Sequence, residues 1–215
     1  MALIFPPWTN HVRVLLGVAL VGGLAYAVVF IDVGFSPKTV NQGYSPEQPV
    51  PYSHLLHAGR LGMDCRYCHS TVEETAMAAL PASGTCMNCH QMVRPTSPAL
   101  LPVRESAAGH TPVAWVRVHQ LPDYVYFNHS AHVRRGVGCV ACHERIDRMA
   151  QVATTKPLSM GWCLDCHRAP EPSLRPLDKV TAMDWVPASD AAVLATTLRQ
   201  ENNINPPTDC ATCHR

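Results

Sequence analysis

Residues 127–143 read FNHSAHVRRGVGCVACH and contain the pattern around which the whole sequence is organised. The last five of these residues form a Cys-x-x-Cys-His motif, and the chain carries this motif five times. All ten cysteines belong to the five motifs. In chain order, the first to fifth motifs are Cys65/Cys68/His69, Cys86/Cys89/His90, Cys139/Cys142/His143, Cys163/Cys166/His167 and Cys210/Cys213/His214.

The spacing within the motif has a chemical reason. Two thiols three residues apart can add to the two vinyl groups of one haem, and the adjacent imidazole then reaches the iron from one face. A single motif is also compatible with a zinc knuckle, a thioredoxin-like dithiol or disulfides. Five copies that all carry the trailing histidine and use every cysteine favour haem attachment. The sequence therefore predicts five c-type haems whose proximal iron ligands are His69, His90, His143, His167 and His214.

Composition indicates a chain with a small apolar core of its own. Aromatic residues make up 7% of the 215 residues, and 19 residues are proline. We expect a multihaem cytochrome c fold of loops and short helices laid over five covalent haems, with little sheet and one N-terminal transmembrane helix. The formal net charge of +1 gives no indication of a nucleic-acid partner.

The N-terminal region contains an apolar run from Val12 to Ile31 whose only charged residue is Arg13. As a helix, about 20 residues would span about 30 Å, enough to cross a bilayer core. A cleaved signal peptide is the alternative. The residues that follow the run offer no small-residue cleavage site, which favours a retained anchor. Because haems of this type are attached outside the cytoplasm, we expect the remaining chain on the periplasmic side of a bacterial cytoplasmic membrane.

The predicted organisation has six parts. They are an N-terminal segment with the anchor (1–32, anchor at about 12–31), a Pro- and Gly-rich tether (33–53), a first two-haem module (54–90), a connector (91–128), a second two-haem module (129–167) and a C-terminal segment with the fifth haem (168–215). Within the connector, the alternation in 115–127 predicts an extended segment. A helix is predicted over 190–200 with Ser189 as its N-cap.

The two modules are an internal repeat. In each, a His-x-x-His pair precedes two motifs, with an aromatic residue two positions before the first histidine. The pairs are His54/His57 and His129/His132. Histidines three residues apart on a helical turn point the same way, so the two cannot bind opposite faces of one iron. Each therefore serves a different haem, and two haems lie against one turn of chain.

Five irons need five distal ligands, and the two pairs supply four: His54, His57, His129 and His132. For the fifth we predict His119, which precedes the second module. Met160 is the second candidate, because a thioether ligand would raise the potential of that haem. His110 is a further alternative, whereas His11 is expected at the membrane edge without a ligand role.

The pattern resembles two families. His-x-x-His before Cys-x-x-Cys-His, with an aromatic residue two positions ahead, resembles the class III multihaem cytochromes c. The single span, the order of the five motifs and the segment VHQLPDYVYFNHSAHV between the modules resemble the pentahaem cytochrome c subunit of bacterial alternative complex III. The second resemblance covers nearly the whole chain.

This resemblance implies an electron-transfer subunit of a membrane complex that oxidises a quinol. Its partners would be an iron–sulfur subunit, multi-span quinol-binding subunits, a monohaem cytochrome c subunit, and a soluble carrier that is either a cytochrome c or a copper protein. On this interpretation the chain conducts electrons and is not by itself an enzyme.

Two alternatives stay open. One is a self-sufficient, membrane-anchored multihaem quinol dehydrogenase, against which the length of the tether argues. The other is a multihaem reductase with one haem open to substrate. Five complete motifs with enough distal ligands argue against the second, and the sequence contains no nucleophile motif or phosphate-binding loop, so no catalytic residue is predicted.

Overall fold

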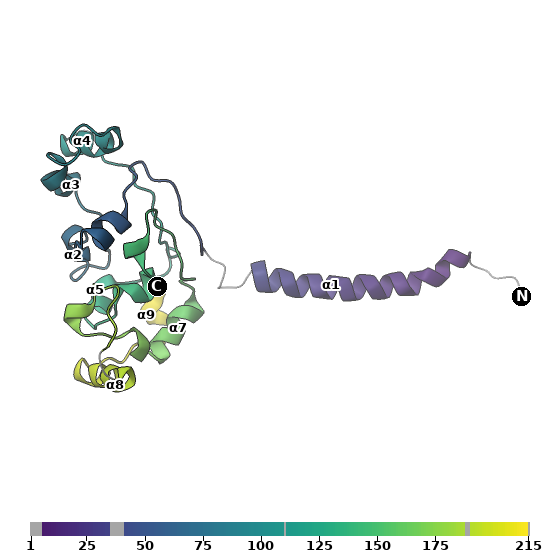
Figure 1. The fold of residues 1–215 in the computed structure, drawn as a ribbon. Helices are drawn as coiled ribbons and strands as arrows, with labels where there is room; N and C mark the ends of the chain where they lie inside the picture. The colour runs from purple at the N-terminus through teal and green to yellow at the C-terminus, as the bar shows by residue number, and fades with distance from the viewer. Residues whose placement is uncertain (1–5, 35–40, 110, 188–189, 215) are drawn as a thin grey trace, which may run out of the picture. The chain divides into compact units, whose positions relative to one another are not determined.

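A computed structural model describes residues 6–34, 41–109, 111–187 and 190–214. The chain divides into two compact units, one ending at Val40 and the other beginning at Asn41. The second unit contains all five motifs. Figure 1 shows the elements of both units, which are described separately below.

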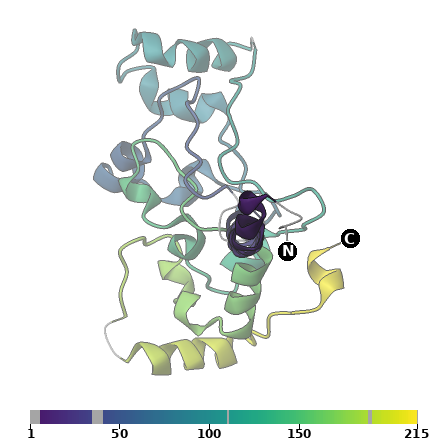
Figure 2. The same cartoon turned by 90° about the vertical axis from the view of Figure 1, so that its right-hand side faces the viewer.

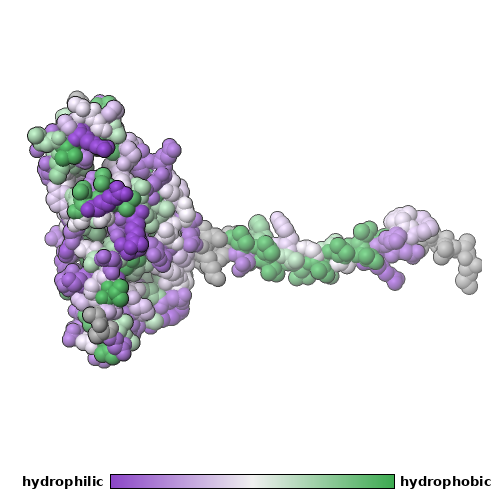
Figure 3. Space-filling view, in the orientation of Figure 1, coloured by the Kyte–Doolittle hydropathy of each residue, from purple (hydrophilic) through white to green (hydrophobic). Residues whose placement is uncertain are grey.

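The first unit contains a 3-10 turn, η1 (Pro7–His11), and the helix α1 (Val12–Gly34). The residues from Pro7 to Val33 are long and apolar enough to cross a membrane, and none of the apolar window is buried. Apolar side chains cover most of the helix surface (Figure 3). The predicted start at Val12 is confirmed, and the helix continues three residues beyond the predicted end at Ile31.

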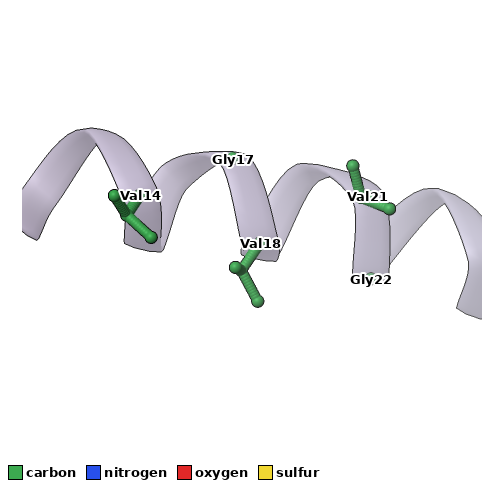
Figure 4. Close-up of a pocket in the computed structure, with 5 residues that line it drawn as sticks. All are labelled: Val14, Gly17, Val18, Val21 and Gly22. Atoms are coloured by element: carbon green, nitrogen blue, oxygen red, sulfur yellow. The ribbon is translucent and has the colours of Figure 1, made fainter.

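One stretch of α1 combines small and β-branched residues. Val14, Gly17, Val18, Val21 and Gly22 line a shallow apolar hollow along the helix (Figure 4). An added Cβ on either glycine would meet no atom within 4 Å. Small residues of this kind let another helix approach closely within a bilayer.

The second unit is built from short helices joined by irregular chain. They are η2 (Leu55–Arg60, a π-helix), α2 (Cys65–Cys68), α3 (Ser83–His90), η3 (Pro98–Leu100), α4 (Leu101–Ala107), α5 (His129–Val133), α6 (Cys139–His143), η4 (Ile146–Arg148), α7 (Met160–Arg168), η5 (Glu171–Ser173), η6 (Leu177–Lys179), α8 (Ala191–Glu201) and α9 (Cys210–Cys213). The helices α3 and α4 lie at one end of this unit and α8 at the other (Figures 1 and 2).

Sheet is nearly absent from the described part of the chain. Two isolated antiparallel bridges join Val125 to His214 and Val137 to Leu174, and no strand is formed. The segment 115–127 is neither helix nor strand. Part of its backbone bonds to side chains, since the Gln48 amide donates to the Val116 carbonyl and accepts from the Val116 N–H. The predicted fold class of short helices and loops with little sheet is confirmed.

Polar side chains begin several of the motif helices. Asp64, Ser159 and Asp209 accept backbone N–H groups at the starts of α2, α7 and α9. The Asp64 carboxylate also accepts from the Arg66 guanidinium at 2.9 Å, and this hydrogen bonding lowers its pKa from 3.8 to about 2. Side-chain capping therefore fixes where these one- or two-turn helices start.

The helix α8 differs from the helix predicted over 190–200. It runs from Ala191 to Glu201, one residue later than predicted, and its N-cap is Asp190, whose carboxylate accepts from the N–H groups of Ala192 and Val193. The predicted cap, Ser189, lies outside the described residues. Asp and Ser are both good N-caps, so local sequence alone could not choose between neighbours.

The apolar core of the second unit is small. One cluster contains Val72, Val133 and Val180, and another contains Leu174, Leu198 and Ile204. Clusters of three residues bury little apolar surface for a unit of this length. This agrees with the small apolar core that the composition predicts.

The predicted tether also needs correction. The Gly43 N–H donates to the Thr154 carbonyl at 2.6 Å, the Thr154 N–H donates to the Tyr44 carbonyl at 2.9 Å, and Val50 is only 5% exposed. From Asn41 on, the chain therefore packs as part of the second unit. Pro and Gly predict irregular backbone correctly here, but irregular backbone can still pair with a distant segment.

Thr154 is the most deeply buried polar residue among those described, with 1% of its surface exposed. Its hydroxyl donates to the Val118 carbonyl at 3.0 Å. The hydroxyl of its neighbour Thr155 is also buried and has no hydrogen-bond partner. Of these two buried hydroxyls, that of Thr154 therefore has a hydrogen-bond partner and that of Thr155 has none.

Candidate haem-iron ligands

Each Cys-x-x-Cys-His motif lies on one of the short helices α2, α3, α6, α7 and α9, or ends just after it. One turn of helix presents both thiols on one side, with the histidine directly following. All ten cysteines fall within the described ranges, and all are free thiols. Cys89 and Cys210 are exposed, and the other eight are half-buried.

The sulfur of Cys166 has a polar neighbour. It lies 3.7 Å from the Ser173 hydroxyl oxygen. A hydroxyl can donate to a sulfur atom, which is a weak acceptor. This contact is therefore compatible with a thioether at Cys166.

The imidazole rings are oriented by the backbone. In seven of the predicted ligands Nδ1 lies 2.7–3.3 Å from a backbone carbonyl oxygen. A carbonyl can only accept, so Nδ1 carries the proton and Nε2 keeps its lone pair for a metal. The seven are His57, His69, His90, His129, His132, His167 and His214.

The three other predicted ligands have buried nitrogens without a partner. These are Nδ1 of His54, Nε2 of His119 and Nδ1 of His143. Burial, with the nearby imidazoles, lowers the pKa of His54 to about 4 and that of His143 to about 3. A buried polar atom without a partner costs about 1–3 kcal/mol. A haem iron binds a neutral imidazole. The unpaired atom of His119 is Nε2, the same nitrogen that the other rings leave free for a metal, so His119 fits this role.

Three histidine pairs have the spacing of two ligands on one iron. The ring centres are 6.2 Å apart for His57 and His90, 6.1 Å for His132 and His167, and 6.4 Å for His129 and His143. A metal that takes an imidazole on each side separates the ring centres by about 6 Å, since each bond is about 2 Å and the nitrogen lies about 1 Å from the ring centre.

The two histidines of the second His-x-x-His pair, His129 and His132, face different motifs. His129 lies beside His143 of the third motif, whereas His132 lies beside His167 of the fourth. In the first module, His57 likewise faces the second motif through His90. This placement is what the bridging prediction requires.

An aromatic ring supports each pair. Phe127 stacks on His132 at 4.6 Å and meets His129 edge-on at 4.7 Å. In the first module, Tyr52 stacks on His57 at 4.4 Å and meets His54 edge-on at 4.9 Å. The repeat predicts an aromatic residue at this position but not its role, which depends on contacts with both rings.

The predicted fifth distal ligand, His119, lies beside the third motif. The His119 ring lies 4.5 Å from His143 of the third motif, whereas the ring beside His214 is that of Tyr124, at 5.8 Å. The structure therefore does not bring His119 to the fifth motif. Met160 begins α7 and is 59% exposed. His110 lies outside the described residues.

Comparison with known proteins agrees with this geometry. Residues 125–215 match the family model of cytochrome c7 and related cytochrome c. The matched residues include the third, fourth and fifth motifs. The chain is thus similar to multihaem cytochromes c, which bind haem and iron and serve in electron transport.

A second comparison matches a longer part of the chain. The chain is 35% identical over 127 residues to the menaquinone reductase, multiheme cytochrome c subunit, of Nitratidesulfovibrio vulgaris (strain Hildenborough). The match covers 59% of this chain and 58% of the relative. The chain is therefore similar to just over half of the length of that protein.

Proposed function

We propose that the chain binds five c-type haems, one on each motif. The ten motif cysteines form the thioether bonds, and the five motif histidines bind the irons from the proximal side. The distal ligands are His54, His57, His129, His132 and His119, with Met160 as the alternative for the fifth. The observation that carries this assignment is the set of seven imidazoles whose Nδ1 atoms are tied to backbone carbonyls, which leaves every Nε2 of the set ready for a metal.

When bound, a c-type haem supplies a one-electron redox couple whose potential depends on its axial ligands. The chain contributes by orienting the imidazoles through carbonyl hydrogen bonds and packing Tyr52 and Phe127 over them. Two imidazoles hold a lower potential than an imidazole with a thioether. Ligation by histidine at most sites therefore favours low-potential, low-spin iron.

We further propose that the chain is an electron-transfer subunit of a membrane quinone oxidoreductase complex and is not by itself an enzyme. The similarity to a menaquinone reductase subunit supports this role, and the exposed apolar helix α1 supports attachment to a bacterial cytoplasmic membrane, with the haem region on the periplasmic side. The partners would be an iron–sulfur subunit, multi-span quinone-binding subunits and a monohaem cytochrome c subunit.

The resemblance to alternative complex III gives the first candidate for the whole complex. Electrons would leave a quinol, pass through this chain and reach a soluble cytochrome c or copper protein. The relative from Nitratidesulfovibrio gives the second candidate, because its name is that of a menaquinone reductase. In that case electrons would travel the opposite way, from a periplasmic donor to a quinone.

The self-sufficient quinol dehydrogenase keeps some support. The length of the tether counts less against it, because the compact haem unit already begins at Asn41, soon after α1 ends at Gly34. A first haem close to the membrane is therefore compatible with the chain length between the two units.

The test is purification from native membranes in mild detergent, with mass spectrometry of the chain and of whatever accompanies it. Five haem additions to the mass are expected, together with an iron–sulfur protein and multi-span proteins in the same preparation. Quinol oxidation coupled to a soluble acceptor would support the first candidate, and quinone reduction from a periplasmic donor would support the second. Quinol oxidation by the chain alone would overturn the assignment to a larger complex.

A further inference from the structure

We infer that the five haem-attachment sites follow one another in space in the order second, first, third, fourth, fifth, and not in the order of the sequence. This inference rests on the proposed function only in that each motif holds a haem. It places the second and fifth motifs at the two ends of the series and the first and third motifs in contact at its middle.

A reciprocal contact joins the two modules. The Leu55 N–H donates to the Met149 carbonyl at 2.9 Å, and the Ser130 N–H donates to the Thr75 carbonyl at 3.2 Å. Leu55 and Ser130 each directly follow the first histidine of their pair. Met149 and Thr75 each lie six positions after the histidine of the other module's first motif. The residue after the first histidine of each module therefore bonds to the residue six positions after the first-motif histidine of the other module.

A second pair of contacts repeats this symmetry. The Arg134 guanidinium donates to the Glu73 carbonyl at 2.7 Å. At the equivalent position of the first module, Gly59 lies so close to the Asp147 carbonyl that an added Cβ would overlap it. Arg134 and Gly59 each lie five positions after the first histidine of their pair. The modules are thus related by an approximate two-fold rotation, as the partners of an isologous contact are.

The axis of this rotation passes between the first cysteines of the two modules. These two residues, Cys65 and Cys139, lie close enough together for each thiol to shift the pKa of the other. Around them, Val72 of the first module and Val133 of the second pack with Val180, and Cys139 lies against this cluster. Identical positions meet each other only on the axis, so the first and third motifs are neighbours across the module boundary.

The second motif lies on the far side of the first. The Asn88 amide, within the second motif, donates to the Tyr67 hydroxyl within the first at 3.2 Å. The Tyr52 ring packs on His57, which faces His90 of the second motif. No equivalent contact links the second motif to the third among the hydrogen bonds and ring contacts of the described residues.

The fourth and fifth motifs extend the series in the other direction. His132, just before the third motif, faces His167 of the fourth. The His167 ring donates to the Pro207 carbonyl at 2.7 Å, three residues before the fifth motif. Electrostatic influence of Cys213 on the Cys163 thiol agrees with this proximity. In Figure 1, α3, α2 and α7, which carry the second, first and fourth motifs, follow one another in this order along the unit.

The exposure of the motif cysteines identifies the same two motifs as the ends of the series. Cys89 of the second motif and Cys210 of the fifth are exposed, whereas both cysteines of the first, third and fourth motifs are half-buried. A redox partner that must approach a haem closely therefore finds access at the second and fifth motifs. The first motif, which comes earliest in the chain, lies inside the series.

The test compares two matched double variants of the full chain, each purified within its complex. Cys65→Ala/Cys68→Ala removes the first attachment site, and Cys86→Ala/Cys89→Ala removes the second. Electron paramagnetic resonance and a redox titration report how many remaining haems change, because magnetic and electrostatic coupling between irons falls steeply with distance. Loss of the second site should shift the signal and potential of one remaining haem, and loss of the first should shift two.

The reverse result, two haems shifted by loss of the second site and one by loss of the first, would overturn the order. If either variant fails to accumulate, an experimental structure of the wild-type complex tests the order of the haems directly. The iron bound by His69 should then be a nearest neighbour of the iron bound by His143, and a structure with the iron of His90 between them would refute the inference. The mass of the wild-type chain separately counts the haems, so a count below five would refute the proposed cofactor content without deciding the order.

Discussion

Replacing Gly136 with alanine should strongly destabilise the haem unit. Gly136 lies in the loop between α5 and α6 with φ of +80°, and an added Cβ would lie 2.5 Å from the Arg175 carbonyl oxygen. That oxygen belongs to the backbone, and the Arg175 N–H donates to the Gly136 carbonyl at 2.9 Å, so neither segment of chain can move away freely. The left-handed conformation costs alanine about 1–2 kcal/mol, and forcing the close contact costs about 1–3 kcal/mol.

The free energy of unfolding should therefore fall by about 2–5 kcal/mol. For a unit of this size, the unfolding temperature of the holoprotein should fall by about 4–20 °C, measured by far-ultraviolet circular dichroism. Gly62→Ala is the matched control, because Gly62 has φ of +66° but no atom within 4 Å of an added Cβ. It should lose only about 2–8 °C. Equal losses in the two variants would refute the reasoning that the contact with Arg175 matters.

Three further predictions follow from the described contacts. Thr154→Val should lower the free energy of unfolding by about 1–3 kcal/mol, because the Val118 carbonyl loses the hydrogen bond from the Thr154 hydroxyl. Thr155→Val should be neutral or stabilising, because the Thr155 hydroxyl is buried without a partner; urea unfolding of both variants checks this. Folding lowers the pKa of Asp64 from 3.8 to about 2, so the ionised carboxylate contributes to the free energy of unfolding above the unfolded-state pKa, and this contribution is lost as the pH falls. The difference in urea midpoint between wild type and Asp64→Asn should therefore shrink between about pH 5 and pH 2. His129→Ala and His132→Ala should disturb different haems in magnetic circular dichroism spectra, and loss of the same single feature in both would contradict the bridging of two irons by one turn of chain.

Local patterns carry most of what could be predicted here. Five copies of the Cys-x-x-Cys-His motif that use every cysteine favour haem attachment, and the composition of the apolar run from Val12 predicts a helix. The repeat of His-x-x-His before two motifs identified two modules without any knowledge of their contacts. Each of these features depends on residues close together in the chain, so the sequence reveals them directly.

The errors occurred where distant segments meet. The predicted tether joins the haem unit from Asn41 because its backbone pairs with Thr154, more than a hundred residues away in sequence. The sequence did not indicate which motif His119 would lie beside, and the fold places its ring next to His143 of the third motif. Composition and counting contain no information about such contacts.

The sequence by itself therefore determined the number of Cys-x-x-Cys-His motifs, the cofactor chemistry that they favour and the presence of one apolar helix. Only the tertiary structure decided how the modules face each other, with Cys65 against Cys139 and the second motif turned outward. The physical reason is that an approximate two-fold rotation exchanges equivalent positions of the two modules. The order of neighbours along the chain then no longer matches the order of neighbours in space.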